Sequence, residues 1–569
     1  HPPKALKELL DKLDPSQRYD RGTQLCLTSE GLFQEVLKKV RAQLDADPQI
    51  TFFSFSQNDW HGYCQCKECT KVAKEEESQS GPLIRFINRL ADEIAKSHPG
   101  VFIDTLAYQY TRKPPKLTKP RDNVVIRLCT IECSFSQTLA DGQQNASLRD
   151  DIKEWHRIAP HLFVWDYVTN FSNYMLPHPN YRVLGSNMRF FLDNGVIGML
   201  EQGDRFCPAG DFVRLRCWVL FKLLWNSQLD QRELMKEFIA GYYAPEFVPI
   251  YMSYFDMLSD AAEKSGVYLN IYRQSTTDWL DVKTLIKATA IMDQALATAK
   301  NLQAKDPVKY AGLVDKVQRE RLPIDYVWAL SRRYYVNMAN AMGVTLPSKL
   351  DADAGGLEWA DTLFANLEKY GVDVFSETGA RNRKESLDVV KRQIYTQCGK
   401  PGLTPEFCKS LPTDRWFEVQ NYSCSLRANP DEATIVDDPA ASDGKAARLA
   451  GHHLEWSTSL RTAWLWQLAF DKAQQKKGNP KYHVYAEVRC EANVDDGTAM
   501  TCGLYNSDTK KSIWHKKISV KEIKGSKYKL IDLGSLELID KAYSVWIAPP
   551  KRPGEVIAVY VDRYIVIRE

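Results

Sequence analysis

Acidic, amide and aromatic side chains recur where short apolar runs end in the first 210 residues. The clearest run, Thr51–Ser56, is followed at once by Gln57, Asn58, Asp59 and Trp60. Four carboxyl groups stand at or just after such runs: Asp59, Glu132, Asp166 and Glu201. The polar and aromatic side chains beside them are Gln57, Asn58, Trp60, Tyr108, Tyr110, Arg127, Trp165, Tyr167, Asn170 and Gln202. Since the carboxyl ends of parallel strands meet at one edge, we expect these side chains to form one site.

This combination of side chains fits hydrolysis of a glycosidic bond. One carboxyl group protonates the leaving oxygen, and a second acts as nucleophile, base or electrostatic partner. The 2-acetamido group of the substrate can replace that second partner, and an Asp or Asn then orients it. We therefore predict the four carboxyl groups as catalytic candidates and the ten other residues as substrate-binding candidates, with no cofactor.

Each candidate also has a structural alternative. Asp59 could cap the following helix, Glu132 could pair with Arg127, and Glu201 could pair with Arg205. Tyr108 and Tyr110 could be core residues of a strand. The sequence leaves these alternatives open.

Three cysteines, Cys64, Cys66 and Cys69, form a cluster after the first clear strand. They could bind a metal if Cys26, Cys129 or His61 supplied a fourth ligand. No second paired set follows at the spacing of a zinc motif, so we favour a local disulfide or a reduced structural knot. The expectation is no metal.

Several other functions are disfavoured by the sequence. A net charge of +3 gives no strong case for nucleic acid. There is no Gly-x-Ser-x-Gly elbow, no phosphate-cradling loop and no His-Glu-x-x-His pair. No apolar run reaches the roughly 20 residues of a membrane-spanning helix. The chain starts at His1 without an initiator Met, which we expect to reflect a processed chain or a piece expressed from a longer one.

The elements that would position the site alternate between strands and helices. This alternation predicts βαβ units and a parallel sheet within residues 1–210. We count about six strands rather than eight, and favour a (β/α)₈-type barrel whose first units are missing over an open doubly wound sheet. The expected strands are Thr23–Leu27, Ile50–Ser56, Phe102–Gln109, Val124–Ile131, Leu162–Tyr167 and Val196–Leu200; the expected helices are Gly31–Leu44, Pro82–Lys96 and Asp150–Ile158.

Two further domains are expected. Residues 211–398 predict a helical region packed on the barrel, including one helix over Val308–Met338. Residues 399–569 alternate apolar and polar positions and predict an all-β, jelly-roll-like sandwich that resembles a carbohydrate-binding module. Asp437–Gly444 is expected to be a calcium-binding or turn segment, and Trp456, Trp464, Trp466 and Trp514 a sugar platform or core residues.

Taken together, the motifs over roughly residues 1–260 resemble glycoside hydrolase family 163. The matching segments are Phe53–Asp59, Tyr63–Cys69, Leu106–Tyr110, Val125–Cys129 with Glu132, Trp165–Tyr167 with Asn170, Gly195–Gly203 and Leu224–Asn226. The resemblance implies a secreted, periplasmic or cell-surface bacterial endo-β-N-acetylglucosaminidase with a (β/α)₈ barrel. Its substrate would be the GlcNAc-β-1,4-GlcNAc core of complex N-glycans. Apart from the resemblance, we expect cleavage with retention, while the stereochemical outcome itself depends on the separation of the carboxyl groups in the structure.

The resemblance also suggests roles for the candidates. In related barrels the acid stands after the fourth strand, and with two units missing that residue is Asp59. Asn58 or Glu132 would then serve the acetamide, while Glu201 is an alternative acid. Competing functions are an exo-hexosaminidase or α-glucuronidase on the same scaffold, or a non-catalytic glycan-binding protein. The expected partner is an N-glycan or glycoprotein, and the oligomeric state is left open.

Overall fold

The structure is a computed structural model. It describes residues 23–347, 350, 355–381, 383–398, 405–411, 415–420, 424–426, 432–450, 458–461, 481–506, 511–537, 543–550 and 554–569.

The N-terminal part contains one parallel sheet in which neighbours in sequence are also neighbours in space. Five of the six predicted strands are confirmed. The sixth, Thr23–Leu27, is wrong: Thr23 makes only an isolated bridge to Gly62, and the Gln24 side chain bonds to the backbone of Asn58 and Trp60. The strands are β1 (Phe52–Ser54), β2 (Phe102–Ala107), β3 (Val124–Cys129), β4 (His161–Tyr167) and β5 (Val196–Gln202).

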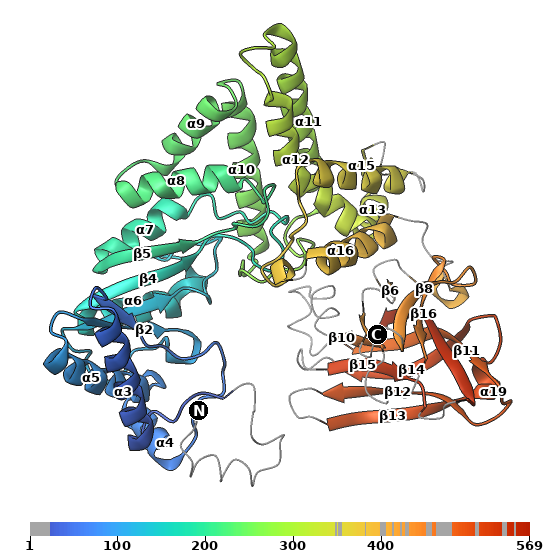
Figure 1. The fold of residues 1–569 in the computed structure, drawn as a ribbon. Coiled ribbons are helices and arrows are strands. Elements are labelled where there is room, and N and C mark those ends of the chain that lie inside the picture. The colour runs from blue at the N-terminus through green and yellow to red at the C-terminus, as the bar shows by residue number, and fades with distance from the viewer. Residues whose placement is uncertain are drawn as a thin grey trace.

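Helices between the strands cover the sheet (Figure 1). The α5 helix, with Pro82 in its first turn as expected, buries Ile84, Ile87, Leu90 and Ile94 in the core that it shares with the sheet. The helices of this part are α3 (Glu30–Ala46), α4 (Lys67–Glu75), α5 (Ser80–Ser97), α6 (Ala146–Ile158) and α7 (Leu184–Asp193), with 3₁₀ turns η1 (Gln109–Thr111) and η2 (Gln143–Asn145).

The sheet is a parallel half-barrel, and the strands of the described residues do not close into eight. Strands β1 and β5 each pair with one neighbour among those residues. Because side chains alternate along a strand, Phe102 and Phe163 lie on the face opposite Ile103 and Val164. On that face Phe52 packs against both rings, with centroids 5.4 and 6.1 Å apart. The fold agrees with part of a (β/α) barrel.

The connection from β4 to α7 is buried over most of residues 167–181. Asp211 and Arg216 hold it in place: Asp211 Oδ2 accepts from the His178 backbone N–H at 3.0 Å and from the Tyr181 hydroxyl. Arg216 donates to Asn180 Oδ1 at 3.0 Å and to Asp211 Oδ2 at 3.0 Å. A buried loop needs such partners for its polar groups.

A helical region follows the sheet, and no described helix combines the length and apolarity that membrane spanning requires. The predicted helix over Val308–Met338 is wrong in extent. It is two helices, because Gly312 has a left-handed φ of 71° at the start of the first and Ser331 (φ −129°, ψ 27°) separates it from the second. The helices are α8 (Val213–Trp225), α9 (Gln231–Tyr242), α10 (Phe247–Ser265), α11 (Val282–Lys305), α12 (Leu313–Leu330), α13 (Arg332–Met342), α15 (Gly355–Lys369) and α16 (Arg383–Cys398), with η3 (Thr378–Arg381) and η4 (Glu406–Cys408).

The C-terminal part is an antiparallel β-sandwich. One sheet has the order β13-β12-β15-β10-β7, and the other β14-β11-β16-β9-β8 with β6 also on β16. Its strands are β6 (Trp416–Gln420), β7 (Ser425–Leu426), β8 (Ala433–Asp437), β9 (Lys445–Leu449), β10 (Thr458–Arg461), β11 (Lys481–Ala492), β12 (Thr498–Asn506), β13 (Lys511–Ser519), β14 (Lys529–Glu537), β15 (Tyr543–Ala548) and β16 (Val556–Arg568), with the short helix α19 (Val520–Ile523).

Two sequence expectations concern details of this sandwich. Asp437–Gly444 contains turns, closed by the Ala441 N–H to Asp438 carbonyl bond at 2.9 Å and the Gly444 N–H to Ala441 carbonyl bond at 3.2 Å. The buried Asp438 side chain accepts from Arg489 Nη2 at 2.8 Å and from the Tyr528 hydroxyl at 2.6 Å. Trp514 lies partly buried against the sandwich core. The other tryptophans proposed for a sugar platform, Trp456, Trp464 and Trp466, lie outside the described residues.

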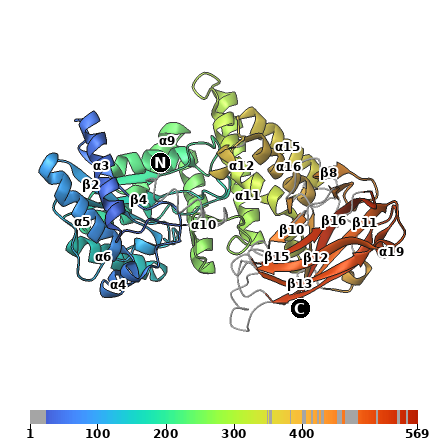
Figure 2. The same ribbon diagram turned by 60° about the horizontal axis from the view of Figure 1, so that its bottom comes forward.

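The helices α11–α16 stand between the half-barrel and the sandwich in both views (Figures 1 and 2). An ion pair between Arg333 of α13 and Glu418 of β6 joins the helices to the sandwich. Glu418 also pairs with the buried Arg563 of β16, which ties this contact to the sandwich core.

Candidate active site

An open pocket of about 500 Å³ lies at the carboxyl edge of the parallel sheet, a size that suits a small ligand. Loops after the first three strands form most of it. The segment between α10 and α11 contributes the remaining wall. The lining residues are His61, Gln109, Tyr110, Ile131, Glu132 and Tyr272.

Glu132 is the carboxyl group that lines this pocket. Burial raises the pKa of its carboxyl, although the positive charge of Arg112 opposes the shift. Arg112 Nη1 lies 3.5 Å from Glu132 Oε2, and its Nε is 2.7 Å from Asp151. Arg127 pairs instead with Asp104 at 3.0 Å, so the alternative of a Glu132–Arg127 pair is wrong. Glu132 is therefore a carboxyl group that holds its proton more tightly than a free glutamate does, next to open space.

Asp59 is held by Tyr108, whose hydroxyl donates to Asp59 Oδ1 at 2.9 Å. Burial, and then the charge of Asp59, raise the pKa of the Tyr108 hydroxyl, so it remains a donor. The alternative that Asp59 caps the next helix is wrong, because the N-cap of α4 is Cys66.

Gln57, at the start of the same loop, connects it to the turn after β2. Its Nε2 donates to the Tyr108 carbonyl at 3.1 Å, and its Oε1 accepts from the Thr111 hydroxyl at 2.6 Å. The backbone N–H of Asn58 donates to Gln24 Oε1 at 3.0 Å, while the Trp60 side chain is exposed. These bonds fix the loop that carries Asp59.

Tyr108 and Tyr110 are not neighbours along a strand, because β2 ends at Ala107 and a 3₁₀ turn follows. Gln109 in that turn has a φ of +52°, a conformation that is strained for a side-chain-bearing residue. Its buried Oε1 has no hydrogen bond among the described residues. Strain of this kind clusters at functional sites, and Gln109 is one of the residues that line the pocket.

Asp166 and Glu201 form a carboxyl pair, on neighbouring strands and in register. Burial raises the pKa of Asp166 to about 6, although a hydrogen bond from Thr130 lowers it. Burial and then the negative charge of Asp166 raise the pKa of Glu201 well above its usual range. The shared proton therefore resides on Glu201. Arg205, the partner proposed from sequence for Glu201, lies over the Phe206 ring instead.

The Asp166→Asn substitution tests this pair through the pH dependence of stability. Asp166 binds its proton more tightly in the folded state than in the unfolded state, so protonation of Asp166 stabilises the fold. This contribution to the free energy of unfolding is complete below about pH 4 and is lost as the pH rises through about 6. We expect the wild type to lose about 3 kcal/mol relative to the variant over this range. Urea melts at several pH values measure it. The matched change at exposed Asp193 should give a pH-independent difference, and a parallel profile for Asp166→Asn would contradict the pairing.

The remaining candidates do not line the pocket, and the polar side chains of Trp165, Gln202 and Asn170 form hydrogen bonds to other protein groups. Trp165 Nε1 donates to Gln202 Oε1 at 2.7 Å. Buried Asn170 donates through Nδ2 to the Arg273 carbonyl at 2.8 Å and accepts from the Arg273 N–H at 3.0 Å. Tyr167 is buried. Their described contacts thus support the edge of the sheet and the segment around Arg273.

Sequence reasoning missed the far wall of the pocket. The segment from Val267 to Arg273 is bonded to the strand-end loops through the Phe135 N–H to Leu269 carbonyl and the Phe171 N–H to Ile271 carbonyl, both 2.8 Å. It brings Tyr272 to the pocket and Tyr268 to the backbone of Glu132. No local sequence pattern predicts that this segment lies at the pocket, because the bonded residues are more than 100 positions apart in the chain.

Comparisons with known proteins give a limited picture. Residues 7–256 match a family model described as a domain of unknown function, DUF4838. No curated protein matches the chain. The solved structures that resemble it include glycoside hydrolases and carbohydrate-binding modules.

Three of these structures illustrate the range. CpGH89 from Clostridium perfringens, in complex with its substrate GlcNAc-alpha-1,4-galactose, is 14% identical to this chain with a TM-score of 0.35. The matched region covers 65% of this chain and 41% of the CpGH89 chain. The CBM22-1 xylan-binding domain of Paenibacillus barcinonensis Xyn10C is 8% identical with a TM-score of 0.18, over 27% of this chain and 85% of that domain. The C-terminal CBM6 of LamC from Zobellia galactanivorans is 6% identical with a TM-score of 0.18, over 27% of this chain and 98% of that one. This chain spans less than half the length of CpGH89.

Proposed function

We propose that this protein is a glycoside hydrolase that cleaves the GlcNAc-β-1,4-GlcNAc core of complex N-glycans. The observation that carries the proposal is Glu132, a carboxyl group with a raised pKa that lines an open pocket at the carboxyl edge of a parallel sheet. A general acid needs such a group, with a raised pKa and access to the substrate.

In this proposal Glu132 protonates the leaving glycosidic oxygen, and the acetamide oxygen of the substrate attacks the anomeric carbon. Asp59, kept in place by Tyr108, accepts a hydrogen bond from the acetamide N–H. It thereby stabilises the positive charge on the five-membered oxazolinium ring that this attack forms. Water then opens this ring, with the Glu132 carboxylate as base, and the configuration is retained. The donor role therefore moves from Asp59, our first choice from sequence, to Glu132.

Aromatic side chains around the pocket would bind the sugar rings. Tyr110 and Tyr272 line the pocket, and the Trp60 side chain is 47% exposed. Flat aromatic surfaces with a polar edge suit the apolar faces of pyranose rings. The buried Asp166–Glu201 pair supports the strand ends in this proposal instead of touching the substrate.

Product analysis on a glycoprotein with complex N-glycans tests the proposal. We expect release of an intact glycan that ends in one GlcNAc, with the other GlcNAc left on asparagine, both measured by mass spectrometry. Release of single hexosamines or of uronic acid would replace this proposal with an exo-hexosaminidase or an α-glucuronidase.

A non-catalytic glycan-binding protein is the second candidate. The five-stranded half-barrel favours it, since the described strands do not close around the pocket. Glycan binding without turnover, unchanged by Glu132→Gln, would support binding alone.

The proposed substrate also sets a location. Complex N-glycans are displayed on secreted and surface glycoproteins, so we propose that the protein acts outside the cytoplasm. Fractionation of the producing cells with an antibody against the chain tests this, and recovery only with cytoplasmic markers would contradict it.

A further inference from the structure

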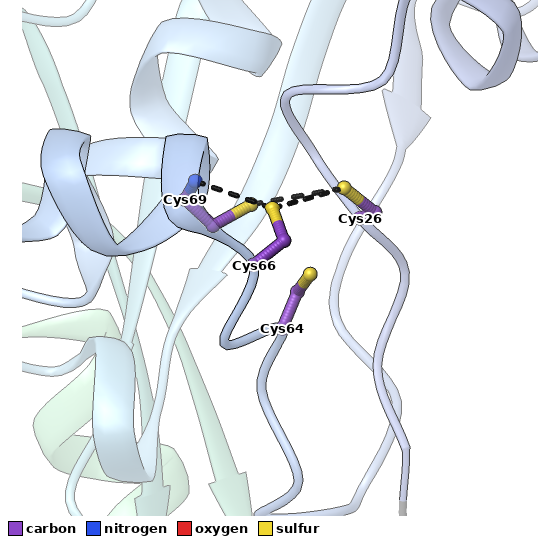
Figure 3. A group of neighbouring side chains, drawn as sticks. All are labelled: Cys26, Cys64, Cys66 and Cys69. Atoms are coloured by element: carbon purple, nitrogen blue, oxygen red, sulfur yellow. Dashed lines mark hydrogen bonds between the residues drawn. The ribbon is translucent and has the colours of Figure 1, made fainter.

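Four cysteine sulfurs converge beside the loop that carries Asp59. They belong to Cys26, Cys64, Cys66 and Cys69, and all lie within 4.8 Å of one another. Figure 3 shows Cys69 in the first turn of α4, Cys66 and Cys64 on the chain leading into it, and Cys26 reaching across from a separate segment. Two stretches of chain distant in sequence thus point their thiols at one centre.

The spacing of the sulfurs matches a metal tetrahedron. A zinc–sulfur bond is about 2.3 Å, so two sulfurs on a tetrahedral zinc lie roughly 3.8 Å apart. Cys26 Sγ is 3.7 Å from Cys66 Sγ and 3.9 Å from Cys69 Sγ. A disulfide would bring two sulfurs to about 2.05 Å, and all four cysteines are free.

The surroundings favour negatively charged sulfur. Cys66 is the N-cap of α4, and the Cys69 N–H donates to Cys66 Sγ at 3.4 Å. The Thr28 hydroxyl lies 3.2 Å from Cys69 Sγ and 3.8 Å from Cys66 Sγ. Backbone and hydroxyl donors of this kind form the outer shell of thiolate metal sites, and a helix N-terminus stabilises negative charge.

Thiolates, not thiols, are the ligands that zinc binds. Binding a cation to all four sulfurs would release the protons still held, so affinity should weaken as pH falls.

We propose that Cys26, Cys64, Cys66 and Cys69 bind one zinc ion in a structural tetrathiolate site. Four thiolates complete a tetrahedron and leave no position for water, which distinguishes a structural site from a catalytic one. This is contrary to the expectation of no metal, which rested on the lack of a second cysteine pair. Cys26 supplies the fourth ligand from a segment without a motif of its own.

The zinc site would also position the proposed active-site loop. Gln24, two residues before Cys26, donates to the carbonyls of Asn58 and Trp60 at 2.7 and 2.6 Å. Its own N–H donates to the Gly62 carbonyl at 2.8 Å. A metal that ties Cys26 to the chain just beyond this loop therefore fixes both sides of Asp59.

The test is the metal content of the full chain purified under reducing conditions. We expect about one zinc per chain by elemental mass spectrometry, and a thiolate-to-metal charge-transfer absorption after exchange with Co²⁺. Cys26→Ser should lower the bound zinc at least about tenfold after dialysis against a weak chelator. The control Cys217→Ser, at an exposed thiol outside the cluster, should keep the wild-type content.

A second measurement covers the case in which Cys26→Ser fails to fold. In the wild type, zinc should protect these four cysteines from alkylation, mapped by mass spectrometry, and a strong chelator should expose them. Hydrogen exchange over residues 58–63 should speed up together with that exposure.

Three results would overturn the proposal. They are a chain that stays metal-free after reconstitution with zinc, iron as the bound metal, or a disulfide among these residues in the reduced preparation. None of these readouts uses glycosidase activity, so a zinc-bound protein that cleaves no glycan would leave this inference standing.

Discussion

Glu132→Gln is expected to reduce kcat/KM for release of complex N-glycans by about 10²–10⁴-fold. The amide keeps the shape of the side chain but has no acidic proton for the leaving oxygen. An aryl glycoside with a good leaving group needs less protonation, so the loss on that substrate should be much smaller. Kinetics on both substrates measure the effect.

The pH profile gives an independent check on the same residue. Burial raises the pKa of Glu132, and the wild type should lose activity on the alkaline side of its pH–rate profile as Glu132 loses this proton. The residual activity of Glu132→Gln should show no such alkaline limb. Glu154→Gln, an exposed change on α6, should leave rate and profile unchanged. Equal losses on both substrates would show that Glu132 is not the acid.

Asp211→Asn is expected to destabilise the half-barrel by about 3–5 kcal/mol. The side chains of Asp211 and Arg216 are 2% and 4% exposed. The amide cannot balance the buried guanidinium, and one acceptor of the buried loop becomes partly a donor. Urea unfolding followed by the fluorescence of the half-barrel tryptophans measures the loss.

A partly exposed carboxylate, which Arg232 and Arg182 both contact, provides the control for this change. Asp256 pairs with Arg232, with side chains 32% and 51% exposed, and Asp256→Asn should cost less than about 1 kcal/mol. A comparable loss in both variants would mean that burial does not set the cost. Since Asp211 lies away from the pocket lining, glycan cleavage by folded Asp211→Asn should stay close to wild type.

Much of the architecture could be predicted because its signals are local. Five parallel strands stand out as apolar runs, and α5 and most of β11 follow the 3.6- and 2-residue periods. Thr23–Leu27 has a similar apolar pattern but is not a strand of the sheet. Its Gln24 side chain donates hydrogen bonds to the loop that carries Asp59. Very short strands, such as β7 and β10, carry too few residues for a period to show.

The site was only partly predictable, because its geometry depends on contacts between distant residues. The carboxyl ends of the strands identified Glu132 and Asp59, since topology alone brings such ends together. Arg112, which limits the rise in the pKa of Glu132, and Cys26, which completes the sulfur cluster, belong to no motif. Their roles depend on loop paths that hydrophobic periodicity does not encode.

The wall that carries Tyr268 and Tyr272 lies beyond residue 256, where the match to the family of unknown function ends. The pocket is thus divided between two stretches of chain, with Glu132 on one and Tyr272 on the other. In the proposed mechanism, substitutions in the Tyr272 wall would change the contacts to the sugar without altering Glu132 or Asp59. Specificity and bond cleavage would then be open to separate adjustment.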